Sequence, residues 1–299
     1  MKPVLQVMAC ATTIAMSVGL ARGTSVRAGQ DVIPQFSSRV QLVEVYASVT
    51  DAAGGPVTGL KASDFEVDED NVPQDISTFA AGEFPLTVAL GVDRSWSMAG
   101  TPLRLAKQAS ESFLRALKPD DRSMVVAISN EGDVIAPLSA ERPTQVAAIE
   151  RLDPWSTTAL YDTIIATLDR LEPEQGRQAL VVFSDGTDRY SHASAADVLA
   201  RARRGNALVY PIAFGKQRPA ILAELASVSG GRSFLLKDAR ELEPTLATIA
   251  RELRYQYLLG YAPRDPVARG SHEWRSIHVA LRNARPGVRV RARDGYTTD

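Results

Sequence analysis

The sequence has 299 residues, of which 45% are hydrophobic and 23% charged, and its formal net charge is −1. These values are ordinary for a globular protein of one large domain or two smaller ones. The near balance of acidic and basic residues gives no reason to expect nucleic acid as a partner.

The first 28 residues have the pattern of a secretory signal peptide. Lys2 precedes an uncharged apolar run over 4–20, and small or branched residues flank Arg27 before a cleavage point after Ala28. We expect export to the periplasm, the cell surface or the medium, with a net charge of −4 once 1–28 is removed. The alternative is an uncleaved membrane anchor, since the run is about 17 residues long. Cys10, the only cysteine, lies in this segment, so the mature chain would have no disulfide.

A short linker over 29–39 precedes an N-terminal β segment over 40–82. Apolar residues stand at every second position from Val43 to Val49, the period of a half-buried strand. A turn follows over 51–56, and 65–67 and 76–79 are further short strands.

The pattern changes over 83–254, where apolar runs alternate with stretches of helical periodicity. A continuous apolar run such as 86–92 is typical of a strand buried on both faces of a parallel sheet. The alternation predicts a doubly wound, mostly parallel, Rossmann-like α/β domain. The expected strands are 86–92, 124–128, 179–183, 207–214 and 233–236, and the expected helices are 102–117, 159–171, 195–202, 221–228 and 242–253.

A two-residue period returns over 255–299, with strands expected at 255–261, 277–281 and 288–292. We expect this segment to pair with 40–82 in a small β-sandwich-like module, with Tyr255, Tyr257 and Tyr261 in its core or at its edge. Six arginines lie between 274 and 293. They could form a polyanion-binding face, but their alternation with Val288, Val290 and Ala292 favours a strand with one solvated face.

Five oxygen-bearing side chains follow the expected strands in a specific order. Asp93, Ser95 and Ser97 form a D-x-S-x-S sequence directly after strand 86–92, Thr158 stands near the start of a helix, and Asp185 follows strand 179–183. Ligands of open α/β sheets bind beyond the carboxyl ends of the strands. Carboxylate and hydroxyl oxygens are ligands suited to hard cations such as Mg²⁺.

This pattern resembles the von Willebrand factor A family and its metal-ion-dependent adhesion site. The resemblance implies that Asp93, Ser95, Ser97, Thr158 and Asp185 hold Mg²⁺ or Mn²⁺, and that the protein is a non-enzymatic binding or adhesion protein. Hydroxyl ligands leave the cation under-neutralised, so an Asp or Glu carboxylate of a protein partner completes its coordination.

Both flanks are similar to a bacterial VWFA-related group first described from acidobacteria. The N-terminal resemblance rests on V-T-G-L at 57–60 and D-F-E-V at 64–67. The C-terminal one rests on Y-L-L-G-Y at 257–261 and R-D-G-Y at 293–296. Together they extend the resemblance over roughly residues 40–298.

The sequence departs from the family at the adhesion site. Trp96 stands where the family usually has glycine, and Ser156 and Thr157 replace a Gly-Gly pair that would give the backbone more freedom. Trp96 and Arg94 are candidates for contacting the partner, and Asp188 is a further candidate near the ion.

Two other functions remain open at this point. One is a metal-free structural or scaffold protein of the cell envelope with the same fold. The other is a hydrolase using Ser184, His192 and Asp185, although no G-x-S-x-G elbow surrounds the serine. The sequence does not indicate the oligomeric state.

Overall fold

The computed structural model describes residues 42–82, 84–214, 216–265 and 271–298. The predicted signal peptide over 1–28 and the linker over 29–39 lie outside these residues. No helix within the described ranges is long and apolar enough to cross a membrane.

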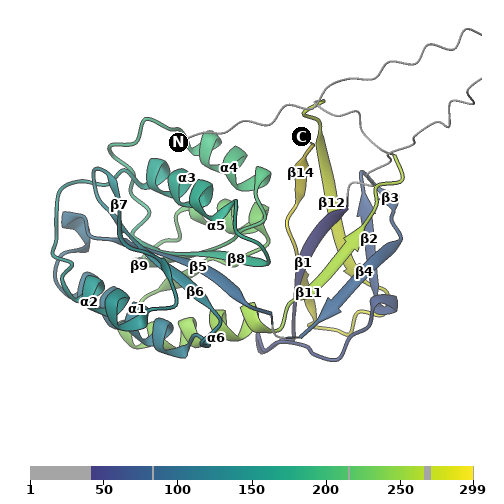
Figure 1. Ribbon diagram of the computed structural model, residues 1–299, viewed down its shortest axis with the longest axis horizontal. Coiled ribbons are helices and arrows are strands. Elements are labelled where there is room, and N and C mark those ends of the chain that lie inside the picture. Colours follow the sequence, from purple (N-terminus) through teal and green to yellow (C-terminus); the bar gives the residue numbers. More distant parts are fainter. Residues whose placement is uncertain (1–41, 83, 215, 266–270, 299) are drawn as a thin grey trace, which may run out of the picture. The chain divides into compact units, whose positions relative to one another are not determined.

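A six-stranded, mostly parallel sheet lies at the centre of the larger, α/β part of the described chain (Figure 1). Its order is β10-β9-β8-β5-β6-β7, and only β7 runs antiparallel to its neighbour. Every residue of β5 and β8 is buried, as expected of strands covered on both faces. The strands are β5 (Leu86–Asp93), β6 (Arg122–Ile128), β7 (Gly132–Ser139), β8 (Arg177–Ser184), β9 (Leu208–Phe214) and β10 (Phe234–Leu236).

Helices cover both faces of this sheet, which confirms the predicted doubly wound fold. One apolar core lies between the sheet and α1 (Thr101–Ala116), α2 (Arg142–Glu150) and α6 (Leu242–Arg254). The other lies between the sheet and α3 (Leu160–Leu171), α4 (Ala195–Arg204) and α5 (Ala220–Ser229) (Figure 1). Neighbouring residues of β5 alternate between the cores: Val88 and Leu90 belong to the first, and Ala89 to the second.

Two four-stranded antiparallel sheets, β13-β1-β11-β4 and β14-β12-β2-β3, form a separate β module from both ends of the described chain. β1 pairs with β11, and β2 pairs with β12, so N-terminal and C-terminal segments lie side by side, as predicted. The strands are β1 (Val43–Thr50), β2 (Phe65–Glu69), β3 (Val72–Pro73), β4 (Ile76–Ala81), β11 (Tyr257–Tyr261), β12 (Trp274–Leu281), β13 (Arg289–Arg291) and β14 (Gly295–Thr297).

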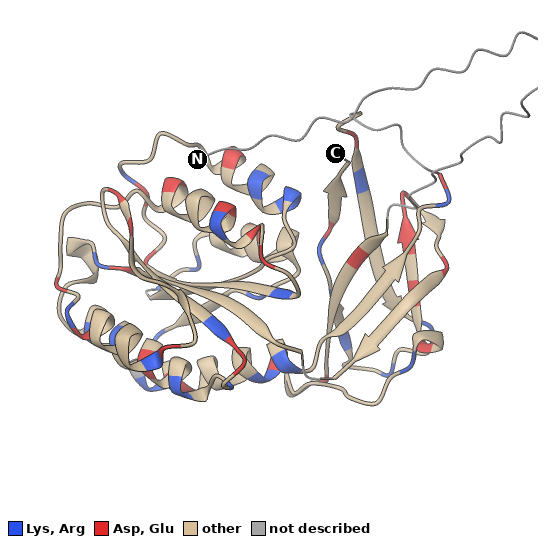
Figure 2. Cartoon of the chain, viewed as in Figure 1, with Lys and Arg blue, Asp and Glu red and all other residues tan. Residues whose placement is uncertain are grey.

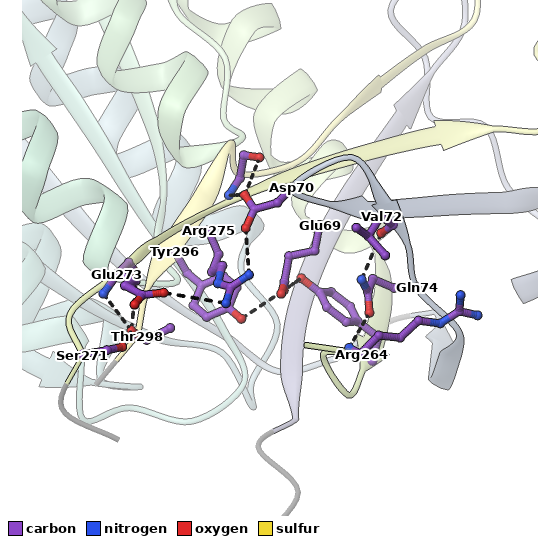
Figure 3. Close-up of polar contacts among 12 residues, drawn as sticks. Glu69, Asp70, Val72, Gln74, Arg264, Ser271, Glu273, Arg275, Tyr296 and Thr298 are labelled. Atoms are coloured by element: carbon purple, nitrogen blue, oxygen red, sulfur yellow. Dashed lines mark hydrogen bonds and ion pairs between the residues drawn. The ribbon is translucent and has the colours of Figure 1, made fainter. Parts of the chain in front are cut away.

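The β module has its own core and an internal polar cluster. Tyr257 and Tyr261 are buried there, as expected, whereas Tyr255 is exposed and directly follows α6, outside β11. The carboxylate of Glu69 is also buried, and its Oε2 accepts hydrogen bonds from the hydroxyls of Tyr261 (2.7 Å) and Tyr296 (3.0 Å). Figure 3 shows this contact beside the ion pair between Asp70 and Arg275.

The arginines between 274 and 293 do not form one solvated face. Arg275 pairs with Asp70, Arg282 with Glu66, and Arg291 with the buried Glu252. Acidic and basic residues are interspersed over the helices and loops around the central sheet (Figure 2). The alternation prediction was therefore wrong for Arg291, because its side chain is drawn inward by a buried carboxylate.

Two elements of the larger domain were absent from the sequence-based prediction. β7 is an edge strand that tolerates Pro137 because its outer side needs no hydrogen-bonding partner, and α2 is a short helix with Pro143 in its first turn. Because proline is unfavourable in both strands and helices, it weakens the strand pattern of β7 and the helical pattern of α2.

Candidate functional site

Asp93 lies at the carboxyl end of β5, beside the carboxyl end of β8. The two strands are parallel and pair up to Val92 and Phe183, so Asp93 faces Ser184, and Asp185 follows one residue later. Asp93 is completely buried, whereas Asp185 is partly exposed. The strand register thus brings together two carboxylates that are 92 positions apart in the sequence.

Ser184, which the metal-site prediction did not include, orients Asp93. Its hydroxyl donates to Oδ2 of Asp93 at 2.6 Å, and the backbone N–H of Ser95 donates to Oδ1 at 2.9 Å. Burial raises the pKa of Asp93, the two serines lower it, and the nearby charge of Asp185 raises it again. The position of Ser184 opposite Asp93 in a neighbouring parallel strand is the sequence signal that could have identified it.

The loop after β5 turns back through a 3₁₀ helix over Trp96–Met98. Met98 is buried in the core beneath α1, which anchors the turn, and its N–H donates to the carbonyl of Ser95 at 2.9 Å. The hydroxyls of Ser95 and Ser97 lie 3.1 Å apart. Asp93, Ser95 and Ser97 therefore belong to one compact loop, with Ser97 exposed.

Thr158 is held at the same edge through its backbone. The carbonyl of Ser129, just after β6, accepts from the N–H of Ala159 at 2.5 Å, and the carbonyl of Thr158 accepts from Arg189 and Tyr190 at 2.9 and 3.0 Å. Within the described residues, the Thr158 hydroxyl forms no hydrogen bond, and none joins its side chain to the other four predicted ligands. Thr158 is only 2% exposed, so its side chain is enclosed by these loops.

Backbone strain marks one of the departures from the family pattern. Ser156 has φ +63°, in the left-handed region that L-residues rarely adopt and glycine adopts freely. Its carbonyl accepts from the N–H of Trp96 at 3.2 Å, which links this strained loop to the loop after β5. The serine therefore adopts a glycine-like conformation in direct contact with the candidate site.

A glycine shapes the loop after β8. Gly186 has φ +81°, and a Cβ at this position would clash with Pro219. The loop therefore passes close to the start of α5 immediately after Asp185, whose Oδ1 accepts from the N–H of Thr187 at 2.8 Å.

The three residues proposed from the sequence to contact the partner differ in their surroundings. Trp96 is 65% exposed and Arg94 is half-buried next to it. Oδ1 of Asp188 accepts from the N–H of Tyr161 at 3.2 Å and from the hydroxyl of Ser191 at 2.7 Å. Asp188 thus ties its loop to the start of α3.

The geometry does not support a Ser-His-Asp triad. Ser184 is buried and its hydroxyl is bonded to Asp93, while the N–H of Gly186 donates to it at 3.0 Å. The imidazole of His192 is exposed and pairs with Asp162 at 3.3 Å.

The chemistry of the donors fits a hard cation. Two carboxylates lie at the carboxyl ends of two neighbouring strands, and three hydroxyl-bearing residues lie on the loops around them. These are the oxygen donors that Mg²⁺ prefers. Neither here nor elsewhere do the described residues contain a group of three His, Cys, Asp or Glu side chains that could hold a metal ion. A cation at this edge would depend on the hydroxyl oxygens.

Comparison with known families gives this architecture a name. The model for the von Willebrand factor type A domain matches residues 88–248, more than half of the sequence. The chain belongs to the von Willebrand factor type A (VWA) domain family. The match runs from β5 into α6 and includes all five predicted ligands. Domains of this family are typically protein-binding modules and usually not catalytic.

Solved structures show the same fold. A von Willebrand factor type A protein from Catenulispora acidiphila has 15% identity and a TM-score of 0.52, over 85% of this chain and 73% of its own. Proximal thread matrix protein 1 from the mussel byssus, with a zinc-occupied MIDAS motif, has 16% identity and a TM-score of 0.51, over 62% of this chain and 49% of its own. No curated protein matches the sequence.

Proposed function

We propose that this protein is an exported VWA-domain protein that binds a protein partner through a divalent cation, Mg²⁺ or Mn²⁺. Asp93, Ser95, Ser97, Thr158 and Asp185 would hold the ion. Export rests on the signal-like pattern over 1–28, and the similarity of the flanks to the bacterial VWFA-related group is part of the same proposal.

The observation that carries the proposal is the buried Asp93 at the end of β5, with a second carboxylate, Asp185, directly after the neighbouring strand β8. Burial is the main cause of the raised pKa of Asp93, and the like charge of Asp185 adds to it. A cation between the two carboxylates removes their repulsion. The bound ion would supply a Lewis-acidic position for an incoming carboxylate oxygen.

The residues around the proposed ion have two roles: some orient Asp93, and others offer neutral oxygen ligands. Ser184 and the N–H of Ser95 hold both oxygens of Asp93 in a fixed orientation, as hydrogen bonds from surrounding groups do for metal ligands in general. Ser97 and Thr158 offer neutral oxygens, so the donor set adds only two negative charges. That charge balance favours an anionic ligand from a partner.

Calorimetric titration of Mg²⁺ and Mn²⁺ into the mature chain tests the proposal. We expect saturable one-to-one binding that Asp93→Ala abolishes. The matched control is Asp121→Asn, another buried aspartate of this domain, whose carboxylate accepts from the N–H groups of Leu86 and Lys118. Absence of binding by the folded wild-type chain would contradict the proposal and favour a metal-free scaffold.

A further inference from the structure

Large aromatic side chains gather around the candidate metal site and project into solvent. Trp96, Trp155 and Tyr190 are 65%, 59% and 58% exposed. Tryptophan is highly buried on average, so two such exposed indoles on neighbouring loops call for an explanation. We refer to Trp96, Trp155 and Tyr190 as the aromatic rim.

Backbone hydrogen bonds connect each member of the rim to the site. Trp96 stands between the predicted ligands Ser95 and Ser97. The N–H of Trp155 donates to the carbonyl of Arg94 at 2.7 Å, and the N–H of Tyr190 donates to the carbonyl of Thr158 at 3.0 Å. The rim residues therefore come from three loops that also hold the candidate ligands.

Two arginines on the same loops could contact an acidic partner. Arg94 is half-buried, Arg189 is exposed, and neither forms an ion pair within the described part of the chain. Trp, Tyr and Arg are the residue types enriched in the energetic centres of protein–protein interfaces. Exposed fractions near 60% mean that the rings stand out from the surface, so they would enter pockets of a partner.

We propose that the aromatic rim binds a protein segment in which an Asp or Glu is flanked by apolar or aromatic side chains. The carboxylate would approach the cation, and the flanking side chains would pack against Trp96, Trp155 and Tyr190. This inference rests on the proposed function, since it takes the cation as the anchor for the carboxylate.

The test uses a phage-displayed library of random peptides, selected on the mature chain in MgCl₂. Enriched peptides should carry an Asp or Glu with an aromatic, Leu or Pro residue close to it, and EDTA should release them. Trp155→Ala and Tyr190→Ala should each weaken the binding of a selected synthetic peptide about tenfold or more. Trp274→Ala and Tyr255→Ala are matched controls, because these exposed aromatics lie outside the site loops, and they should leave the affinity unchanged.

Titration of Mg²⁺ into each variant separates the possible failures. If Mg²⁺ binds normally and the rim variants bind the acidic peptide as well as the wild type does, the rim proposal is wrong and the proposed function stands. Selection of no peptide, or binding of the uronate polymer polygalacturonate instead, would also overturn the rim proposal. If folded wild-type chain binds no Mg²⁺, both proposals fail.

Discussion

Two buried carboxylates of this chain have contrasting surroundings. The carboxylate of Glu69 in the β module accepts hydrogen bonds from two tyrosine hydroxyls, so its hydrogen-bonding partners come from within the chain. Asp93 in the VWA domain accepts hydrogen bonds from one hydroxyl and one backbone N–H, and it also lies near the like charge of Asp185. Burial of a carboxylate is therefore insufficient to identify a functional site. The informative feature is a second carboxylate at the end of a neighbouring strand that has no ion-pair partner among the described residues.

The contrast extends to the neutral groups nearby. Around Glu69, the hydroxyls of Tyr261 and Tyr296 are used inside the module, and Asp70 and Arg275 neutralise each other (Figure 3). Around Asp93, the Thr158 hydroxyl has no partner within the described residues, and Ser156 holds a strained conformation. Strain and unused donors or acceptors are more typical of functional sites than of structural ones.

Removal of the structural carboxylate should destabilise the protein most. Glu69→Leu should lower the free energy of unfolding by about 3 kcal/mol, because two buried tyrosine hydroxyls lose their acceptor. Chemical denaturation measures this loss. Glu69→Gln keeps an oxygen acceptor and should cost clearly less. Equal losses for both variants would show that the hydrogen bonds to Glu69 contribute little.

Ser184→Ala should lower the affinity for Mg²⁺ more than it lowers the stability of the fold. Loss of the hydroxyl that orients Asp93 should weaken Mg²⁺ binding about 10- to 100-fold, as for other residues that support metal ligands. Calorimetry measures this change. Ser110→Ala is the matched control, since Ser110 is also buried but donates to the carbonyl of Ala106 in α1. An unchanged affinity for Ser184→Ala would contradict the orienting role.

Relief of the strained backbone at Ser156 should change stability only slightly. Ser156→Gly should raise the free energy of unfolding by up to about 1 kcal/mol, because relief of the left-handed conformation outweighs the greater entropy of an unfolded glycine. Ser77→Gly in strand β4 should instead destabilise the protein, since its φ is ordinary for a strand. Thermal denaturation compares the two. Destabilisation by Ser156→Gly would indicate that the serine side chain makes a necessary contribution.

The sequence was sufficient to predict the fold class because the buried strands have continuous apolar runs and the flanking strands alternate. It was also sufficient to predict that Asp93 and Asp185 follow strands of the same parallel sheet. It did not identify Ser184 as the orienting residue, because that role depends on the register of β5 against β8.

Two other features lay beyond the sequence pattern for physical reasons. The exposure of Trp155 and Tyr190 depends on how separate loops approach each other, and no periodicity encodes it. Arg291 stands in an alternating stretch that predicts a solvated face, yet Glu252 on α6 draws it inward. Pairing of this kind depends on tertiary contacts between distant parts of the chain.

In the function proposed above, the loops around Asp93 hold a cation with one position open to a carboxylate. Water-proton relaxation of Mn²⁺ tests it most directly, because the signal reports exchangeable water on the bound ion. We predict enhanced relaxation when Mn²⁺ binds the wild-type chain, a decrease when an acidic peptide displaces water, and no enhancement for Asp93→Ala. Enhancement that persists in Asp93→Ala, or its absence from the folded wild-type chain, would contradict this proposal.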